Sequence, residues 1–184
     1  MSAQPQTKAP LTKVITGRAR LSYVTLFVPR ASEDGGDPKY SVAVLIPKSD
    51  KVTVAKINAA VEAAKQAGAG LWGGKVPAGL KTPLRDGDTE RDGDEYKGHW
   101  FLNASSKNKP GVVDSNVQPV MDASEVYSGC YGRVSINFYP FNAKGNRGVA
   151  AGLQNVQKLD DGEPLSGHST PENDFTSSND DFLS

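Results

Sequence analysis

The sequence predicts a mainly β protein: a small closed barrel with one helix, a long irregular insertion and a disordered acidic C-terminal tail. Three observations lead to this class. Six extended stretches alternate with turn signals, the first of them carries an internal glycine, and only one stretch has a helical pattern of apolar residues. At 184 residues, the chain can bury one sizeable core and is too short for two domains of average size.

The chain begins with a polar segment, residues 1–11, which contains two prolines and is predicted to be a disordered arm. Residues 12–28 follow as a long strand, in which Gly17 predicts a bulge or a bend of the kind found at barrel corners. Beyond the bend, alternation places Leu21 and Tyr23 on one face and the neighbouring arginines on the other. The next strand, residues 39–46, is nearly continuous in apolar residues and is expected to be buried on both faces.

The helix is expected directly after this second strand. Ser49 or Asp50 can cap its first turn, and the glycine at position 68 can end it. Apolar residues at helical spacing form one face, which predicts that the helix packs on the barrel and carries no chemistry. They are Val54, Ile57, Val61 and Ala64.

Residues 71–98 show no regular periodicity, and an irregular segment of this length inside a compact domain is usually functional or mobile. Residues 88–94 superficially resemble a calcium-binding loop. The twelfth position of that loop would be His99, where a bidentate Glu is required, and the flanking helices are missing. We therefore expect a solvated turn region and no metal.

Further extended stretches complete the outline, at residues 99–107, 112–122, 125–141 and 148–158. Together with the bent first strand they predict an OB-fold-like barrel. The usual OB order places the helix after the third strand, whereas here it follows the second. The barrel is therefore better supported than its exact topology.

Residues 125–141 alternate between two different faces. One face is apolar or small and suits a core, whereas the other carries Tyr127, Tyr131, Arg133 and Tyr139. Single-stranded nucleic acid binds to such surfaces, because bases stack on tyrosine and phosphates pair with arginine. Tyrosines are also good strand formers whose cross-strand pairs stabilise sheets, and the pattern alone leaves both interpretations open.

The charge is divided unevenly along the chain. Residues 159–184 contain seven acids and no Lys or Arg, so residues 1–158 hold all 21 basic residues with 14 acids, a net of +7. A basic body with an acidic tail is typical of a nucleic-acid binder that carries its own polyanion. We expect phosphate contacts from Arg18, Arg20, Lys107 and Arg133, and Trp100 is a weaker stacking candidate because its strand can turn either face to the core.

Several classes are disfavoured by the composition. Cys130 is the only cysteine, which excludes an internal disulfide and suggests a reducing compartment. The two histidines are far apart, so the usual zinc ligands are not available. No nucleophile elbow or P-loop is present, and we expect neither an enzyme nor a cofactor. No apolar run is long enough to span a membrane, and no signal peptide is visible.

Seven segments in one order resemble a family of phage-encoded single-stranded-DNA-binding proteins. They are GRARLSY (17–23), YSVAVLIPKSD (40–50), LRDGD (84–88), HWFLNASS (99–106), KPGVVD (109–114), VYSGCYGRVSINFYPF (126–141) and NRGVAAGLQNVQ (146–157). The resemblance covers residues 12–158 and implies an OB-fold domain that sequesters single-stranded DNA during phage replication or recombination. It also implies the cytoplasm of an infected bacterium as the location. Strand annealing, or a virion structural role, remains an alternative, and homodimer formation is left open.

The tail, residues 159–184, is expected to be a flexible segment of its own. Its end, with Asp180, Asp181 and Phe182, is similar to the acidic tips of replicative single-strand-binding proteins, in which a phenylalanine docks on partner enzymes. The resemblance implies that phage or host replication proteins are partners of this tip. A tail that only improves solubility is the alternative.

Overall fold

The computed structural model describes residues 11–32, 35–143 and 145–165. The proposed N-terminal arm, apart from Leu11, and the tail tip with Asp180, Asp181 and Phe182 lie outside these residues. In chain order the elements are β1 (Lys13–Ile15), β2 (Ala19–Arg30), β3 (Lys39–Pro47), α1 (Lys51–Ala67), η1 (Ala69–Trp72), β4 (Arg85–Asp86), α2 (Gly87–Glu90), η2 (Asp94–Tyr96), β5 (His99–Ser106), β6 (Gly111–Val113), η3 (Ala123–Glu125), β7 (Tyr131–Ala143) and β8 (Asn146–Asp160).

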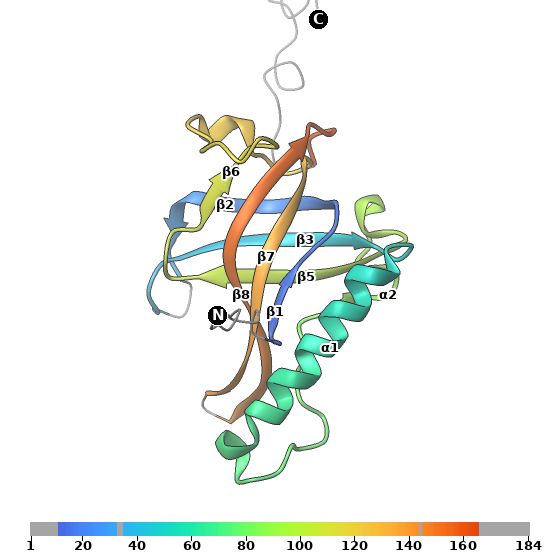
Figure 1. The fold of residues 1–184 in the computed structure, drawn as a ribbon, viewed down its shortest axis with the longest axis vertical. Coiled ribbons are helices and arrows are strands. Elements are labelled where there is room, and N and C mark those ends of the chain that lie inside the picture. Colours follow the sequence, from blue (N-terminus) through green and yellow to red (C-terminus); the bar gives the residue numbers. More distant parts are fainter. Residues whose placement is uncertain (1–10, 33–34, 144, 166–184) are drawn as a thin grey trace, which may run out of the picture.

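The strands form one sheet that closes on itself. Its order is β1-β7-β2-β3-β5-β8-β6, and β7 also pairs with β8, so β7, β2, β3, β5 and β8 make a ring. Neighbours in the ring are antiparallel except β5 and β8, which run parallel. Figure 1 shows α1 lying beside this strand assembly. The predicted mainly β, OB-like fold is confirmed, and the insertion before β5 contains β4, α2 and η2 besides irregular chain.

Gly17 marks the bend in the first strand, as expected. β1 and β2 lie on either side of it and both pair with β7, through Val14 with Ile136 and Ala19 with Gly132. A side chain at position 17 would meet the start of α1, because a Cβ there would lie 2.6 Å from Asp50 Oδ2. The bend is therefore required both by the closure of the sheet and by the packing of the helix.

The alternation predicted for the second half of this strand is wrong after Leu21. Tyr23 has a φ of 47°, and the register with β3 shifts between Ser22 and Thr25. This bulge turns Tyr23 outward, where it is 71% exposed, and Leu26 takes the next buried position.

The helix begins and ends where the sequence predicts. The Asp50 side chain accepts a hydrogen bond from Thr53 N at the N-terminus, and Gly68 is the C-cap residue. Ile57, Val61 and Ala64 are buried as expected. α1 thereby packs on β1 and β7 and covers one side of the barrel.

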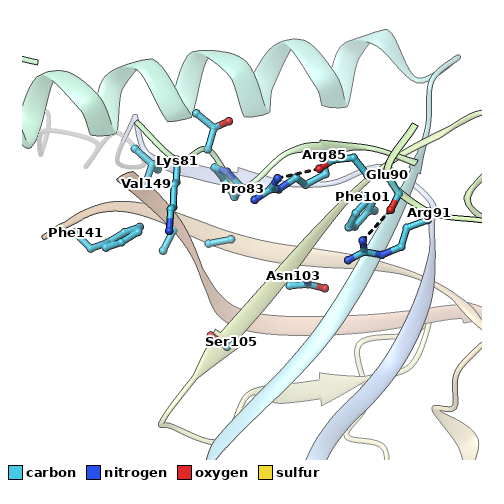
Figure 2. A pocket seen from close by; sticks show the side chains of 13 residues that line it. Lys81, Pro83, Arg85, Glu90, Arg91, Phe101, Asn103, Ser105, Phe141 and Val149 are labelled. Atoms are coloured by element: carbon cyan, nitrogen blue, oxygen red, sulfur yellow. Dashed lines mark hydrogen bonds and ion pairs between the residues drawn. The ribbon is translucent and has the colours of Figure 1, made fainter. Parts of the chain in front are cut away.

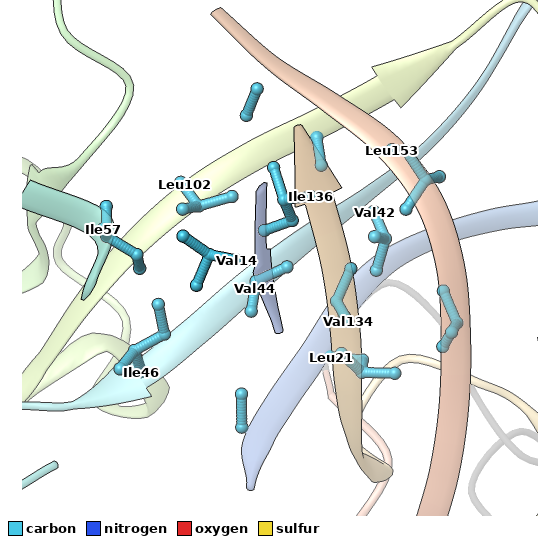
Figure 3. Packing of buried hydrophobic residues seen from close by; sticks show 14 of the residues in the cluster. Val14, Leu21, Val42, Val44, Ile46, Ile57, Leu102, Val134, Ile136 and Leu153 are labelled. Carbon is cyan, nitrogen blue, oxygen red and sulfur yellow. The ribbon is translucent and has the colours of Figure 1, made fainter. Parts of the chain in front are cut away.

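The main core lies inside the ring, where Val44, Leu102, Val134 and Ile136 pack against residues of α1 and β1 (Figure 3). β3 is buried on both faces, as predicted. Its inward residues join this core, while Ala43 and Leu45 pack with Tyr96 and Phe101 on the outer face. The insertion therefore covers part of the outside of the barrel.

The predicted strand 125–141 begins later than expected. Glu125 ends the turn η3, and β7 starts only at Tyr131. Between them Gly129 has a φ of 118°, a conformation that favours glycine, and its N–H bonds to Leu21 O at 2.7 Å. Tyr127 is consequently in a loop and does not share a strand with Tyr131.

Candidate nucleic-acid interface

A groove of about 420 Å³ lies on the outer face of the barrel, over β5 and β8 (Figure 2). The insertion before β5 forms one wall and the last residues of β7 form the opposite end. Its lining combines cations, rings and small polar side chains, among them Lys81, Arg85, Arg91, Phe101, Asn103, Ser105 and Phe141.

The floor of the groove follows from the strand register. Ser105 pairs with Gly152, and Ala150 pairs with Tyr139, so these residues share the outward face. Small side chains keep this surface low, and Tyr139 stands beside it with 42% of its surface exposed. A flat strip bordered by aromatic rings suits an extended chain of unpaired bases.

The wall of the groove is joined to the barrel at both ends. At one end Lys81 lies next to β8, where Val149 N donates to Lys81 O at 2.9 Å. At the other end β4 pairs with β5, and Lys48 Nζ lies 2.6 Å from Asp86 Oδ1 and 2.7 Å from Asp88 Oδ2. The insertion is thus clamped to the strand that precedes α1.

The clamp also accounts for the residues that resemble a calcium loop. Hydrogen bonds from Lys48 and from Gly98 N–H lower the pKa of the Asp88 carboxyl, and the bonds to Asp86 and Asp88 raise the pKa of Lys48. The Asp88 carboxylate is therefore satisfied by the protein's own groups. Within the described ranges, no cluster of three or more metal-binding side chains occurs.

Cations of the groove lie at its exposed rim. Arg85 Nη1 lies 2.9 Å from Glu90 Oε1, and Lys81 Nζ lies 3.1 Å from Asn146 Oδ1. The Arg91 guanidinium lies over the Phe101 ring, 4.7 Å from its centroid. Such solvent-exposed partnerships are weak, so phosphates can replace them.

A second cluster on β2 and β7 contains three of the residues that the sequence singled out. The guanidinium groups of Arg18 and Arg20 lie 4.4 and 5.7 Å from the Tyr131 ring centroid. Arg18 is paired with Asp160, and Arg20 donates to Glu163 O at 2.6 Å. The segment after Lys158 thus lies against the predicted cations, Asp160 through its carboxylate and Glu163 through its backbone carbonyl.

Tyr127 anchors the same part of the chain. Its hydroxyl donates to Gly162 O at 2.9 Å and accepts from Gly162 N at 3.1 Å. Leu165 is buried, and its N–H donates to Ser128 O at 3.0 Å. The surroundings of Tyr127 are those of a structural tyrosine.

The other predicted residues are dispersed. Arg133 is exposed two residues beyond Tyr131, with its Nε 3.0 Å from Thr16 O. Lys107 lies after β5 and pairs with Asp37 at 3.1 Å. Trp100 alternates with the groove-facing residues of β5 and lies under Lys48 Nζ, 4.8 Å from its ring centroid.

The structure therefore brings together Arg18, Arg20 and Tyr131, with Tyr127 alongside, and separately places Tyr139 beside the groove. The sequence reasoning missed the rest of the groove, which is lined by Lys81, Arg85, Arg91, Phe101, Asn103 and Phe141. Two signals were present: an irregular insertion of functional length, and the continuation of the outward alternation from Tyr139 to Phe141.

Known proteins resemble this chain in sequence and in fold. Residues 12–183 match the family model described as Enterobacter phage Enc34, ssDNA-binding protein. Protein p50 of Acyrthosiphon pisum secondary endosymbiont phage 1 is 33% identical over 165 residues, which cover 84% of this chain and 87% of that protein.

Solved structures match as well. The single-stranded DNA-binding protein from bacteriophage Enc34, in complex with ssDNA, is 28% identical with a TM-score of 0.77, over 85% of this chain and 91% of that one. The single-stranded DNA binding protein encoded by bacteriophage T7 has a TM-score of 0.62 over 90% of this chain and 96% of that one. At 16% identity it supports the fold alone.

Proposed function

The chain belongs to the family of the Enterobacter phage Enc34 ssDNA-binding protein, and from this premise we propose that it binds and protects single-stranded DNA, without strong sequence preference, during phage DNA replication or recombination. The observation that carries the proposal is the match, at a TM-score of 0.77, to a relative solved in complex with ssDNA. The family is one of binding proteins, and the function is binding rather than catalysis.

The DNA strand runs through the groove on β5 and β8. Its bases stack on Tyr139 and Phe141, and its phosphates pair with Lys81, Arg85 and Arg91 at the rim. The chemistry of the lining supports this path, because rings beside a low floor accept bases while the cations remain reachable from solvent.

The cluster on β2 and β7 extends the surface. Arg18, Arg20 and Arg133 supply phosphate contacts around Tyr131, and a phosphate that reaches Arg18 replaces Asp160. Lys107 contributes a phosphate contact just after β5, and Trp100, on the face of β5 away from the groove, is a weaker stacking candidate. Tyr127 supports the cluster from its loop.

The tail modulates this binding and docks partner proteins. Residues 166–184 hold four more acids, and a tethered polyanion competes with DNA for the same cations at an effective concentration of order millimolar. When DNA occupies the surface, Asp180, Asp181 and Phe182 become available to phage or host replication proteins. Asp160, the first acid of the tail, pairs with Arg18, which supports the competition.

A salt titration tests the function. Oligonucleotides in single- and double-stranded form are titrated with the wild type and with a Lys81→Ala/Arg91→Ala variant, and a Lys51→Ala/Lys56→Ala variant of the α1 surface is the charge-matched control. We expect tighter binding to the single strand, and a log–log salt slope that falls by about 0.7 per lost phosphate contact in the groove variant only. Equal affinity for single- and double-stranded DNA would contradict the function. Equal salt slopes in the groove variant and the α1 variant would show that the binding site lies elsewhere.

A further inference from the structure

The amide of Asn103 stands in the middle of the groove floor without a protein partner. Asn103 lies on β5 between the Phe101 side and the Phe141 side of the groove, and its side chain projects outward (Figure 2). Within the described chain no hydrogen bond to this amide is found. Asn103 is exposed, so its amide can bond to solvent or to a ligand in the groove.

The neighbours of Asn103 leave its amide accessible. Its partner across the strand pair is Ala43, which is 2% exposed, and Ala150 lies on the β8 side of the floor. Neither side chain can hydrogen-bond with the amide or hold it in one orientation. The amide is free to turn about its last torsion angle.

This position is where the edge of a stacked base would come. Phe141 and the Arg91 guanidinium border the floor at opposite ends. A base that stacks on Phe141, with its ring standing on the floor, would turn an edge toward β5. The polar side chain on the floor between Phe141 and Phe101 is the amide of Asn103, which such an edge could reach.

We propose that Asn103 hydrogen-bonds to the Watson–Crick edge of an unpaired base, and that the groove recognises in this way that the strand is single. The inference rests on the proposed function and adds the group that reads the state of the strand. An asparagine amide has one carbonyl acceptor beside one NH₂ donor. Each of the four bases has an adjacent donor and acceptor on its Watson–Crick edge, and turning the amide by half a revolution exchanges the two roles.

The consequence is recognition without sequence preference. In a duplex the Watson–Crick edges are occupied by the opposite strand, so the amide finds no partner there. An amide held in one orientation by a neighbour would favour some bases over others. The Asn103 amide can turn, so it adapts to all four. Asn103 thus discriminates by whether a base is paired, and not by which base it is.

The variant Asn103→Leu tests this, since leucine has a similar size and no polar atoms. Affinity is measured for four homopolymeric oligonucleotides, for an oligonucleotide of abasic nucleotides and for a duplex. We expect a loss of roughly 5- to 10-fold for each homopolymer, the usual range for one or two neutral hydrogen bonds. Affinity for the abasic strand and for the duplex should stay unchanged.

Asn58→Leu, an exposed asparagine of α1, is the matched control and should leave all affinities unaltered. If Asn103→Leu weakens the abasic strand as much as the homopolymers, the amide contacts the backbone and the inference is wrong. If it weakens binding to one homopolymer only, Asn103 recognises that particular base, and the inference of recognition without sequence preference is wrong. If Asn103→Leu leaves homopolymer affinity unchanged while the wild type still prefers single strands, only the inference is wrong. If the wild type itself shows no preference for single strands, the proposed function is wrong.

Discussion

Tyr127 and Tyr139 come from one alternating pattern but have different surroundings. The hydroxyl of Tyr127 is bonded to Gly162 on both its donor and its acceptor side, whereas Tyr139 stands 42% exposed beside the groove. A ring whose polar end is engaged within the fold supports the fold. A ring that stands free beside a flat strip is available to a base.

Replacing Tyr139 with Ala should lower affinity for single-stranded DNA by about 1–3 kcal/mol, the usual value of a stacked base. The melting temperature should change little, because the removed ring faces outward. Binding titrations and thermal unfolding on the same samples check this.

Tyr127→Phe is the comparison for this variant. It removes only the hydroxyl and its bonds to Gly162 and Asp161, so stability should fall by about 1 kcal/mol and DNA affinity should follow only weakly. Parallel losses of stability and affinity in Tyr139→Ala would show that its ring is structural after all.

At the scale of elements, the insertion before β5 is a wall joined to the barrel by backbone pairing, to which Lys48 adds a side-chain clamp. Lys48 directly precedes the turn into α1 and pairs with Asp86 at the end of β4 and with Asp88 in α2. Gly87 lies between these two carboxylates, where a Cβ would be 2.5 Å from Tyr96 O, so the backbone is closely packed as well. Arg85 and Arg91 flank this clamp in the chain, so we expect it to help fix their position.

Lys48→Met should therefore loosen the wall without unfolding the barrel. We expect faster amide exchange across residues 85–98 and weaker binding to single-stranded DNA, because the rim cations lose their fixed position. The exchange of the core strands β3 and β7 should be unaltered and is the internal control. Uniformly faster exchange would mean that Lys48 supports the whole fold.

The clamp also has a predictable pH dependence. The pKa of Asp88 is lowered below its usual 3.8, so its contribution is complete above that value and is lost as the pH falls through the lowered pKa. The pKa of Lys48 is raised above its usual 10.5, so the alkaline loss begins only beyond that value. Amide exchange at Gly98, which donates to Asp88, should be protected between these limits and should lose protection in acid before β3 does.

At the scale of the whole molecule, the acidic segment does not begin where the fold ends. β8 runs to Asp160, and residues 161–165 continue along the loop before β7, with Leu165 buried. We propose Leu165 as the end of the folded domain. Among the described residues, no helix is long and apolar enough to cross a membrane. The seven acids are therefore divided between three that lie at the domain surface and four beyond it.

Two truncations separate these groups. Removal of residues 166–184 should tighten single-strand binding at low salt, because it deletes an intramolecular competitor whose effect fades as salt screens it. Removal of residues 159–184 should instead lower stability by about 2 kcal/mol, because it deletes buried Leu165 and the partners of Tyr127. A salt series on both proteins, with thermal unfolding, checks this, and unchanged affinity at low salt in the shorter deletion would limit the tail to partner docking.

The sequence by itself determined the features that depend on neighbours in the chain. Asp50 and Gly68 delimit the helix through capping, and Gly17 marks the bend in the first strand because a glycine inside a strand is typical of a bulge or bend. The inward residues of β7 follow from their period of two, which is a property of any strand. These signals were sufficient for a mainly β, OB-like fold with one long helix.

Only the tertiary structure decided which residues become neighbours on the outward faces of the strands. Arg18 and Asp160 are 142 residues apart and meet because β2 and β8 both pair with β7. Asn103 and Phe141 likewise share a groove only because the sheet closes and the insertion lies over it. The alternation along a strand predicts that a side chain points outward. Which residues then surround it depends on strand order and sheet closure, which involve contacts between distant parts of the chain.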